Sequence, residues 1–272
     1  MRSFHQFDCH GEILAGTLDG GHNSCGLLIV SGGNEIRAGA HAGMAKLAQK
    51  LSAEGYPVFR YDRRGIGDSS GINQGFLESS ADIHAATQYF RKTCPGITKL
   101  VAFGNCDAAS ALTLFGKGLP VDRFILANPW VIEQTVADNQ TATAPPPSAI
   151  RSRYWQRIKN PRSIIDLLTG KIDLGKLVKG LKQASQKHEN TELSIRIKDG
   201  LAGLHKPCRI LLANHDTTAL AFLAAWNSKI FANIRKMPDI TTGTIESASH
   251  GFADDTSRKW LENQILEVLK KA

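Results

Sequence analysis

Residues 99–115 read KLVAFGNCDAASALTLF, and they carry the clearest indication of the fold class. The stretch begins with an apolar run typical of a buried strand and ends with a small, apolar run typical of a helix. Gly104 and Ala108 lie two residues before and two residues after Cys106. Small side chains at these positions let a tight turn pass the neighbouring strand and helix. The stretch therefore predicts a strand, a sharp turn that exposes Cys106, and a helix.

Predicted strands and helices alternate on both sides of this turn. We expect strands at residues 12–18, 25–30, 57–61, 99–103, 123–127, 208–213 and 241–246, and helices at residues 40–54, 81–92, 108–115, 219–226 and 257–270. Such alternation is typical of the α/β class, with a mostly parallel central sheet flanked by helices. A chain of 272 residues with 42% hydrophobic content is long enough for one such domain.

The alternation is interrupted in the middle of the chain. It breaks near Pro129 and Trp130, and the three prolines at residues 145–147 mark a loop. Beyond them the sequence is basic and helical in pattern. We predict that residues 1–128 and 207–272 form one core and that residues 129–206 are a helical cap insertion.

The basic charge of the chain is concentrated in this insertion. The formal net charge is +8, and residues 151–206 account for all of it, with 13 Lys and Arg against five Asp and Glu. Such a segment indicates either a solvated helical face or a surface that meets an anionic substrate or membrane. Nucleic-acid binding is not expected, because Tyr154 and Trp155 are the few aromatic residues available there for stacking on bases.

Composition also indicates where the protein is located in the cell and whether it binds a metal or cofactor. The sequence has no apolar run of about 18 residues, and its first residues lack the apolar stretch of a secretory signal. We therefore expect a cytoplasmic protein. The five cysteines show no CxxC spacing, so neither a zinc site nor a disulfide framework is predicted. No metal or cofactor is expected.

Two residues further along the chain complete a candidate catalytic group. Asp216 follows the strand predicted at residues 208–213, and His250 follows the last predicted strand. An isolated cysteine commonly fills a core position. The chain order nucleophile, acid, histidine instead favours Cys106 as nucleophile, His250 as base and Asp216 as the acid that orients it. His215 is the nearest rival to His250 and is expected to line the site.

The acyl chemistry of such a group needs two donors for an oxyanion. The backbone N–H of Asp107 is the first candidate, and the N–H of Gly33, in a glycine turn after an early strand, is the second. Residues next to these positions are predicted to contact substrate: Asn34, Asn105, Trp130 and His215.

Several motifs together resemble a known family. They are SGGNEIRAGAH at residues 31–41, FRYDRRGIGDSSG at 59–71, ADIHAA at 81–86, FGNCDAASAL at 103–112, ILANPWV at 125–131, RYWQRI at 153–158 and LLTGK at 167–171. The chain resembles α/β hydrolases of the exosortase A system-associated hydrolase 1 type. That resemblance implies the α/β-hydrolase fold and a bacterial cytoplasmic protein encoded among genes for exopolysaccharide production and C-terminal protein sorting. It implies no particular substrate.

Three functions follow as hypotheses. The first is a hydrolase that cleaves an ester or thioester through a covalent acyl-enzyme on Cys106, with a small-molecule, glycan or lipid acyl substrate. The second is an acyltransferase that uses the same residues. The third is a hydrolase-fold protein that binds a partner without catalysis. The sequence leaves the oligomeric state open.

Overall fold

The structure is a computed structural model that describes residues 1–133 and 191–272. The strands are β1 (Arg2–Cys9), β2 (Glu12–Asp19), β3 (Cys25–Val30), β4 (Val58–Tyr61), β5 (Lys99–Asn105), β6 (Arg123–Ala127), β7 (Cys208–Ala213) and β8 (Ile240–Ile245). The α-helices are α1 (Gly43–Ala53), α2 (Ser80–Thr93), α3 (Asp107–Phe115), α7 (Glu192–Gly203), α8 (Thr217–Trp226) and α9 (Asp255–Lys270). Every strand and helix predicted outside the insertion is present, with ends shifted by at most three residues.

The eight strands form one sheet in the order β1-β2-β4-β3-β5-β6-β7-β8. Strands β1 and β2, and β2 and β4, pair antiparallel, whereas every neighbouring pair from β4 to β8 is parallel. The expectation of a mostly parallel sheet is confirmed. Because parallel strands place their carboxyl ends at one edge, the turns after β3, β5, β6, β7 and β8 gather there.

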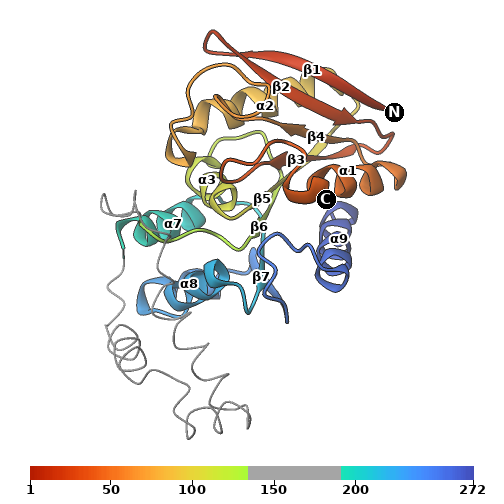
Figure 1. Ribbon diagram of the computed structural model, residues 1–272. Helices are drawn as coiled ribbons and strands as arrows, with labels where there is room; N and C mark the ends of the chain where they lie inside the picture. Colours follow the sequence, from red (N-terminus) through yellow and green to blue (C-terminus); the bar gives the residue numbers. More distant parts are fainter. Residues whose placement is uncertain (134–190) are drawn as a thin grey trace, which may run out of the picture.

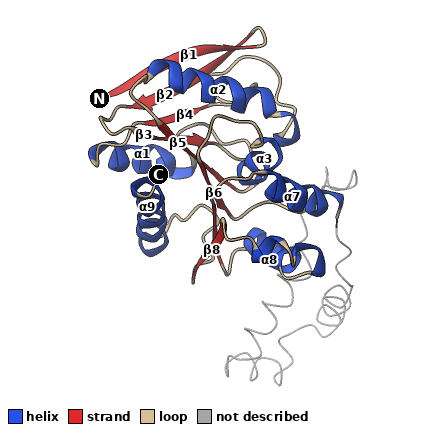
Figure 2. Cartoon of the chain, turned by 180° about the vertical axis from the view of Figure 1, so that it is seen from behind, coloured by secondary structure: helices blue, strands red, loops and turns tan. Residues whose placement is uncertain are grey.

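Helices cover both faces of the sheet, as Figures 1 and 2 show from opposite sides. Helices α1 and α9 bury Leu47, Leu51, Leu261 and Ile265 against one face. The other face packs against α2, α3, α7 and α8. Strand β3 is buried along its whole length, which explains its unbroken apolar sequence, because a strand between two helix layers has no solvent face.

Strand β1 is the one strand of the described sheet that the sequence pattern did not predict. It forms a hairpin with β2, and Cys9 pairs with Glu12 across a two-residue loop. Both loop residues, His10 and Gly11, have positive φ, as a type I′ turn requires. The inward positions of β1 include Ser3 and His5 as well as Phe7, so the period-2 apolar signal is weak.

The predicted cap falls mostly outside the described residues, since residues 134–190 are not described. The two flanking segments are joined by hydrogen bonds. Thr191 donates its hydroxyl to the carbonyl of Val131 (3.1 Å), and the N–H of Leu193 donates to the carboxylate of Glu133 (2.8 Å). Helix α7, assigned to the cap from sequence, packs its apolar side on the core beside α3. The cap itself stays a prediction.

In the described part of the chain, no helix is long and apolar enough to cross a membrane.

Candidate active site

Cys106 lies in the sharp turn between β5 and α3, as the sequence predicts. Its φ of 62° and ψ of −127° are unusual for a residue with a side chain and are typical of a strained nucleophile turn. A Cβ at Gly104 would lie 2.7 Å from the carbonyl carbon of Ala108 and 2.8 Å from the nitrogen of Ala109, so only glycine fits there. Ala108 is itself buried and is accommodated in the first turn of α3.

Asp216 and His250 meet at the carboxyl edge of the sheet. Nδ1 of His250 lies 3.0 Å from Oδ2 of Asp216. Asp216 lies three residues after the end of β7 and caps α8, because the same Oδ2 accepts the N–H groups of Thr218 (3.1 Å) and Ala219 (3.0 Å). The cap fixes the rotamer of the carboxylate, and the carboxylate fixes the orientation of the imidazole ring.

The surroundings of His250 favour its protonated form. Hydrogen bonding to Asp216 and interaction with Cys106 raise the pKa of His250 to about 10, although partial burial acts in the opposite direction. The structure thus brings the three predicted catalytic side chains together from β5, β7 and the turn after β8. Nδ1 faces the acid, which leaves Nε2 for the sulfur and a substrate.

Two asparagines hold the backbone of His250. The side-chain amides of Asn105 and Asn128 donate to its carbonyl at 3.2 and 3.0 Å. Asn128 is fully buried, has a φ of 42° and accepts the N–H of Ala213 at 2.9 Å. It therefore links the ends of β6 and β7 to the histidine turn. Asn105 was predicted to contact substrate. Its side-chain amide donates to the His250 carbonyl instead, although the residue also lines the pocket described next.

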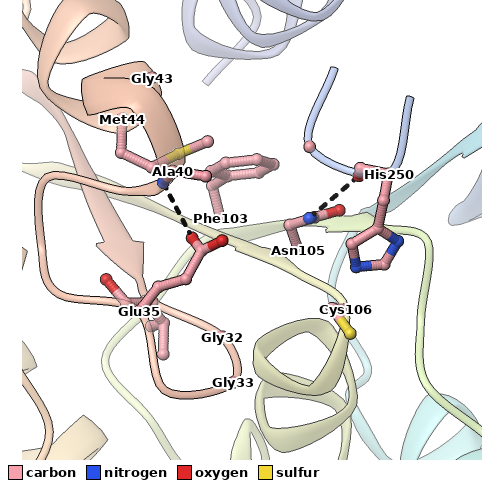
Figure 3. Close-up of a pocket in the computed structure, with 13 residues that line it drawn as sticks. Gly32, Gly33, Glu35, Ala40, Gly43, Met44, Phe103, Asn105, Cys106 and His250 are labelled. Atoms are coloured by element: carbon pink, nitrogen blue, oxygen red, sulfur yellow. Dashed lines mark hydrogen bonds between the residues drawn. The ribbon is translucent and has the colours of Figure 1, made fainter. Parts of the chain in front are cut away.

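A pocket of about 110 Å³ opens beside these residues (Figure 3). It is lined by Val30, Ser31, Gly32, Gly33, Glu35, Ala40, Gly43, Met44, Phe103, Asn105, Cys106, His250 and Gly251. Figure 3 shows the His250 ring above the Cys106 sulfur, with Met44 and Phe103 forming the apolar part of the wall. The pocket thus combines a thiol, an imidazole and an apolar surface, as acyl chemistry requires.

The Gly33 N–H, predicted as an oxyanion donor, has a partner within the protein. It donates to Oδ1 of Asp107 at 2.6 Å. Arg63, a buried residue, donates to the carbonyl of Gly33, and its Nη2 lies 3.9 Å from Oδ2 of Asp107. Gly32 must be glycine here, since a Cβ would lie 2.6 Å from the backbone carbonyl oxygen of Asn105. The backbone N–H of Asp107, the other predicted donor, has no acceptor among the described residues.

Three residues predicted to contact substrate do not line this pocket. Asn34 accepts from the amide of Asn73 (2.8 Å) on the surface. Trp130 packs against the core and donates its indole N–H to the carbonyl of Ile132 (2.6 Å). His215 points to Glu246, with Nε2 3.1 Å from the carboxylate. All three lie close to residues of the site in sequence, but their side-chain partners lie outside this pocket.

Several residues of this site were not predicted from the sequence. Asn128 and Arg63 each follow a strand that ends at the carboxyl edge, and that position could have identified both. Met44 and Phe103 were assigned only to a helix and a strand. Their place in the wall depends on how α1 and β5 pack, which no local pattern shows.

The other cysteines differ from Cys106 in their surroundings. Burial raises the pKa of Cys9 and of Cys25 to about 11, and it also raises the pKa of Cys94 and of Cys208. All five cysteines are free thiols. Across residues 1–133 and 191–272, no group of three His, Cys, Asp or Glu side chains is arranged to hold a metal ion.

Sequence comparison relates the chain to a family of enzymes. The family model Hydrolase_4, described as "Serine aminopeptidase, S33", matches residues 26–219, which is more than half of the chain. The match includes Cys106 and Asp216. No protein with a curated function is matched by the sequence.

Solved structures share the fold. The Pyrococcus furiosus esterase Pf2001 is 13% identical with a TM-score of 0.64, covering 100% of this chain and 91% of that one. The Mycobacterium smegmatis proline iminopeptidase is 14% identical with a TM-score of 0.61, covering 99% of this chain and 98% of that one. A thioesterase domain from the curacin biosynthetic pathway is 15% identical with a TM-score of 0.56, covering 98% of this chain and 99% of that one. The fold is the α/β-hydrolase fold.

Proposed function

Because the chain belongs to the family described as serine aminopeptidase S33, a family of α/β hydrolases, we propose that it is a hydrolase that uses Cys106 where that family uses serine. The bond cleaved is an ester or a thioester, and the acyl group passes through a thioester on Cys106. The observation that carries this proposal is that His250, which is paired with Asp216, lines the same pocket as Cys106.

The first half-reaction transfers the acyl group to sulfur. His250 takes the thiol proton of Cys106, the sulfur attacks the acyl carbon, and the carbonyl oxygen becomes an oxyanion near the N–H of Asp107. The bond to the alcohol or thiol then breaks. With a pKa of about 10, the His250 ring already carries the proton that this leaving group needs. His250 thus acts as general acid in this step.

The second half-reaction needs His250 as a base. Interaction with Cys106 is among the causes of the raised pKa of His250. Acylation removes the thiol hydrogen bond and any charge on sulfur, so that contribution is lost and the ring releases its proton more easily. His250 can then take a proton from water, which attacks the thioester and frees the acid and the Cys106 sulfur.

The proposal extends to the cellular role that the resembled subtype implies. We place the protein in the bacterial cytoplasm, acting on an acylated small molecule, glycan or lipid linked to exopolysaccharide production. The motifs at residues 31–41, 59–71 and 103–112 support this assignment. Deletion of the gene should alter the acylation of the exopolysaccharide or of its precursors, and an unaltered acyl content would contradict it.

One experiment tests the chemistry. Iodoacetamide at neutral pH should label Cys106 in preference to the other cysteines, whose pKa values burial raises. A panel of esters and thioesters should be hydrolysed by the wild type and not by Cys106→Ala, while Cys94→Ala serves as the matched control. Ester hydrolysis that survives in Cys106→Ala would refute the mechanism. Acyl transfer that rises with the concentration of an added alcohol would identify an acyltransferase instead.

A further inference from the structure

The N–H of Gly33 is held by a carboxylate at the place where the reaction needs an oxyanion donor. The Gly33 nitrogen lies 2.6 Å from Oδ1 of Asp107, a charge-assisted hydrogen bond. Asp107 follows Cys106 directly, so its carboxylate and its backbone N–H lie on the same turn. An oxyanion formed on the substrate requires this donor and is repelled by a fixed negative charge beside it.

A second partner for this carboxylate lies within reach. Arg63 is buried, and among the described residues Asp107 is its only ion-pair partner, at 3.9 Å between Nη2 and Oδ2. The same guanidinium donates to the carbonyl of Gly33. The Asp107 carboxylate thus lies between the Gly33 N–H, to which it is hydrogen-bonded, and the Arg63 guanidinium. The distance to the guanidinium is about one ångström longer than a hydrogen bond.

We propose, on the premise that Cys106 is the nucleophile, that the Asp107 carboxylate competes with the substrate oxyanion for the Gly33 N–H. Acyl transfer requires the carboxylate to leave Gly33 and close on Arg63. The displacement of the Asp107 carboxylate therefore limits the rate of acylation, and acyl groups that can displace it are selected. Alkylation of the same sulfur forms no oxyanion and is free of this competition.

The test compares two reactions at one sulfur. The reagents are p-nitrophenyl acetate, which acylates through an oxyanion, and iodoacetamide, which alkylates by direct displacement. The ratio of their rate constants at Cys106, measured by mass spectrometry of the modified residue, cancels changes in the nucleophilicity of the sulfur. Loss of one oxyanion donor typically costs a factor of 10² to 10³, so we expect Asp107→Ala to raise the ratio on the order of 10-fold or more.

Two further variants sharpen this result. Asp107→Asn keeps the side-chain volume and an acceptor oxygen but removes the charge, so the ratio should rise less than in Asp107→Ala. Asp107→Asn also provides the test if the alanine variant disturbs the turn. Asp255→Ala is the matched control, because Asp255 is the first residue of α9 as Asp107 is of α3, and it does not line the pocket. The control should keep the wild-type ratio.

The outcomes separate this inference from the proposed function. If both reagents modify Cys106 and the ratio stays the same or falls in both Asp107 variants, the competition does not exist, although Cys106 remains the nucleophile. If neither reagent modifies Cys106 in the wild type, the proposed function fails and this inference fails with it.

Discussion

Oδ2 of Asp216 lies 3.0 Å from Nδ1 of His250 and also accepts two N–H groups of the first turn of α8. One oxygen atom thus holds the imidazole and begins a helix. Because asparagine caps helices as well as aspartate does, mutation can remove the negative charge and keep the cap.

Asp216→Asn should keep the fold and lose the activity. With its amide oxygen in the place of Oδ2, asparagine can cap α8 and accept from Nδ1 of His250, but it carries no negative charge to stabilise the protonated ring. We expect kcat for ester hydrolysis to fall by about 10²–10⁴-fold, the usual contribution of general acid–base catalysis. Asp216→Ala should lose as much activity and in addition about 0.5–2 kcal/mol of stability with the cap. Steady-state kinetics and urea unfolding of both variants measure the two effects, and equal stabilities would contradict the capping role.

The stability of the protein should depend on pH through His250. The pKa of this ring is raised to about 10 in the folded protein, above its unfolded value of about 6.5. The stabilisation by the protonated ring is therefore complete below about pH 6.5 and is lost as the pH rises through about 10. The difference in unfolding free energy between the wild type and His250→Gln should shrink over this range.

The coupled cysteine supplies a control for this measurement. In a Cys106→Ala background the difference between His and Gln at position 250 should be smaller, because Cys106 contributes to the raised pKa of His250. Denaturant titrations of the four proteins across this pH range test both statements. A difference that does not vary with pH would show that the ring is neutral throughout.

Asn128 should act as a positioning residue for His250. Asn128→Ala leaves the carbonyl of His250 with one amide donor in place of two and the N–H of Ala213 without its acceptor. We expect a loss of about 1–3 kcal/mol in stability, together with a lower kcat and little change in KM. Asn105→Ala removes only one of these bonds and should cost less stability. An Asn128→Ala variant with reduced stability but full kcat would make the residue purely structural.

Met44 should limit the length of the acyl chain. It lines the pocket of about 110 Å³ beside Cys106 and also a neighbouring cavity of about 70 Å³. Met44→Ala would join the two, and kcat/KM should shift toward longer acyl chains in a series of p-nitrophenyl esters. Met237→Ala, another half-buried methionine that packs on the opposite face of the sheet, should lose stability without this shift. An unchanged chain-length profile in Met44→Ala would place the acyl chain elsewhere.

The sequence predicted the elements of the sheet well, because their signals are local. Apolar runs such as residues 25–30 and 208–213 mark buried parallel strands, and Gly104 marks the turn before Cys106. That Asp216 and His250 lie at the same edge of the sheet could also be predicted, because each follows a late strand. Strand β1 escaped prediction because its inward side chains are partly polar, and its pairing is visible only across the hairpin.

The internal contacts of the site were not predictable in the same way. The bond between Gly33 and Asp107 joins residues 74 positions apart and depends on one side-chain rotamer. His215 was expected to line the pocket because it precedes Asp216, but it turns to Glu246 on the surface. Sequence positions after strands therefore located the candidate site at the carboxyl edge of the sheet, whereas the direction of each side chain followed from tertiary packing.

Two hydrogen bonds, between Val131 and Thr191 and between Glu133 and Leu193, mark a place where a segment of the chain could be exchanged. They hold the residues on either side of the 134–190 segment next to each other on the core, while Cys106, Asp216 and His250 all lie outside that segment. A protein engineer could therefore exchange that segment without altering any of the three residues that we propose to carry out the chemistry.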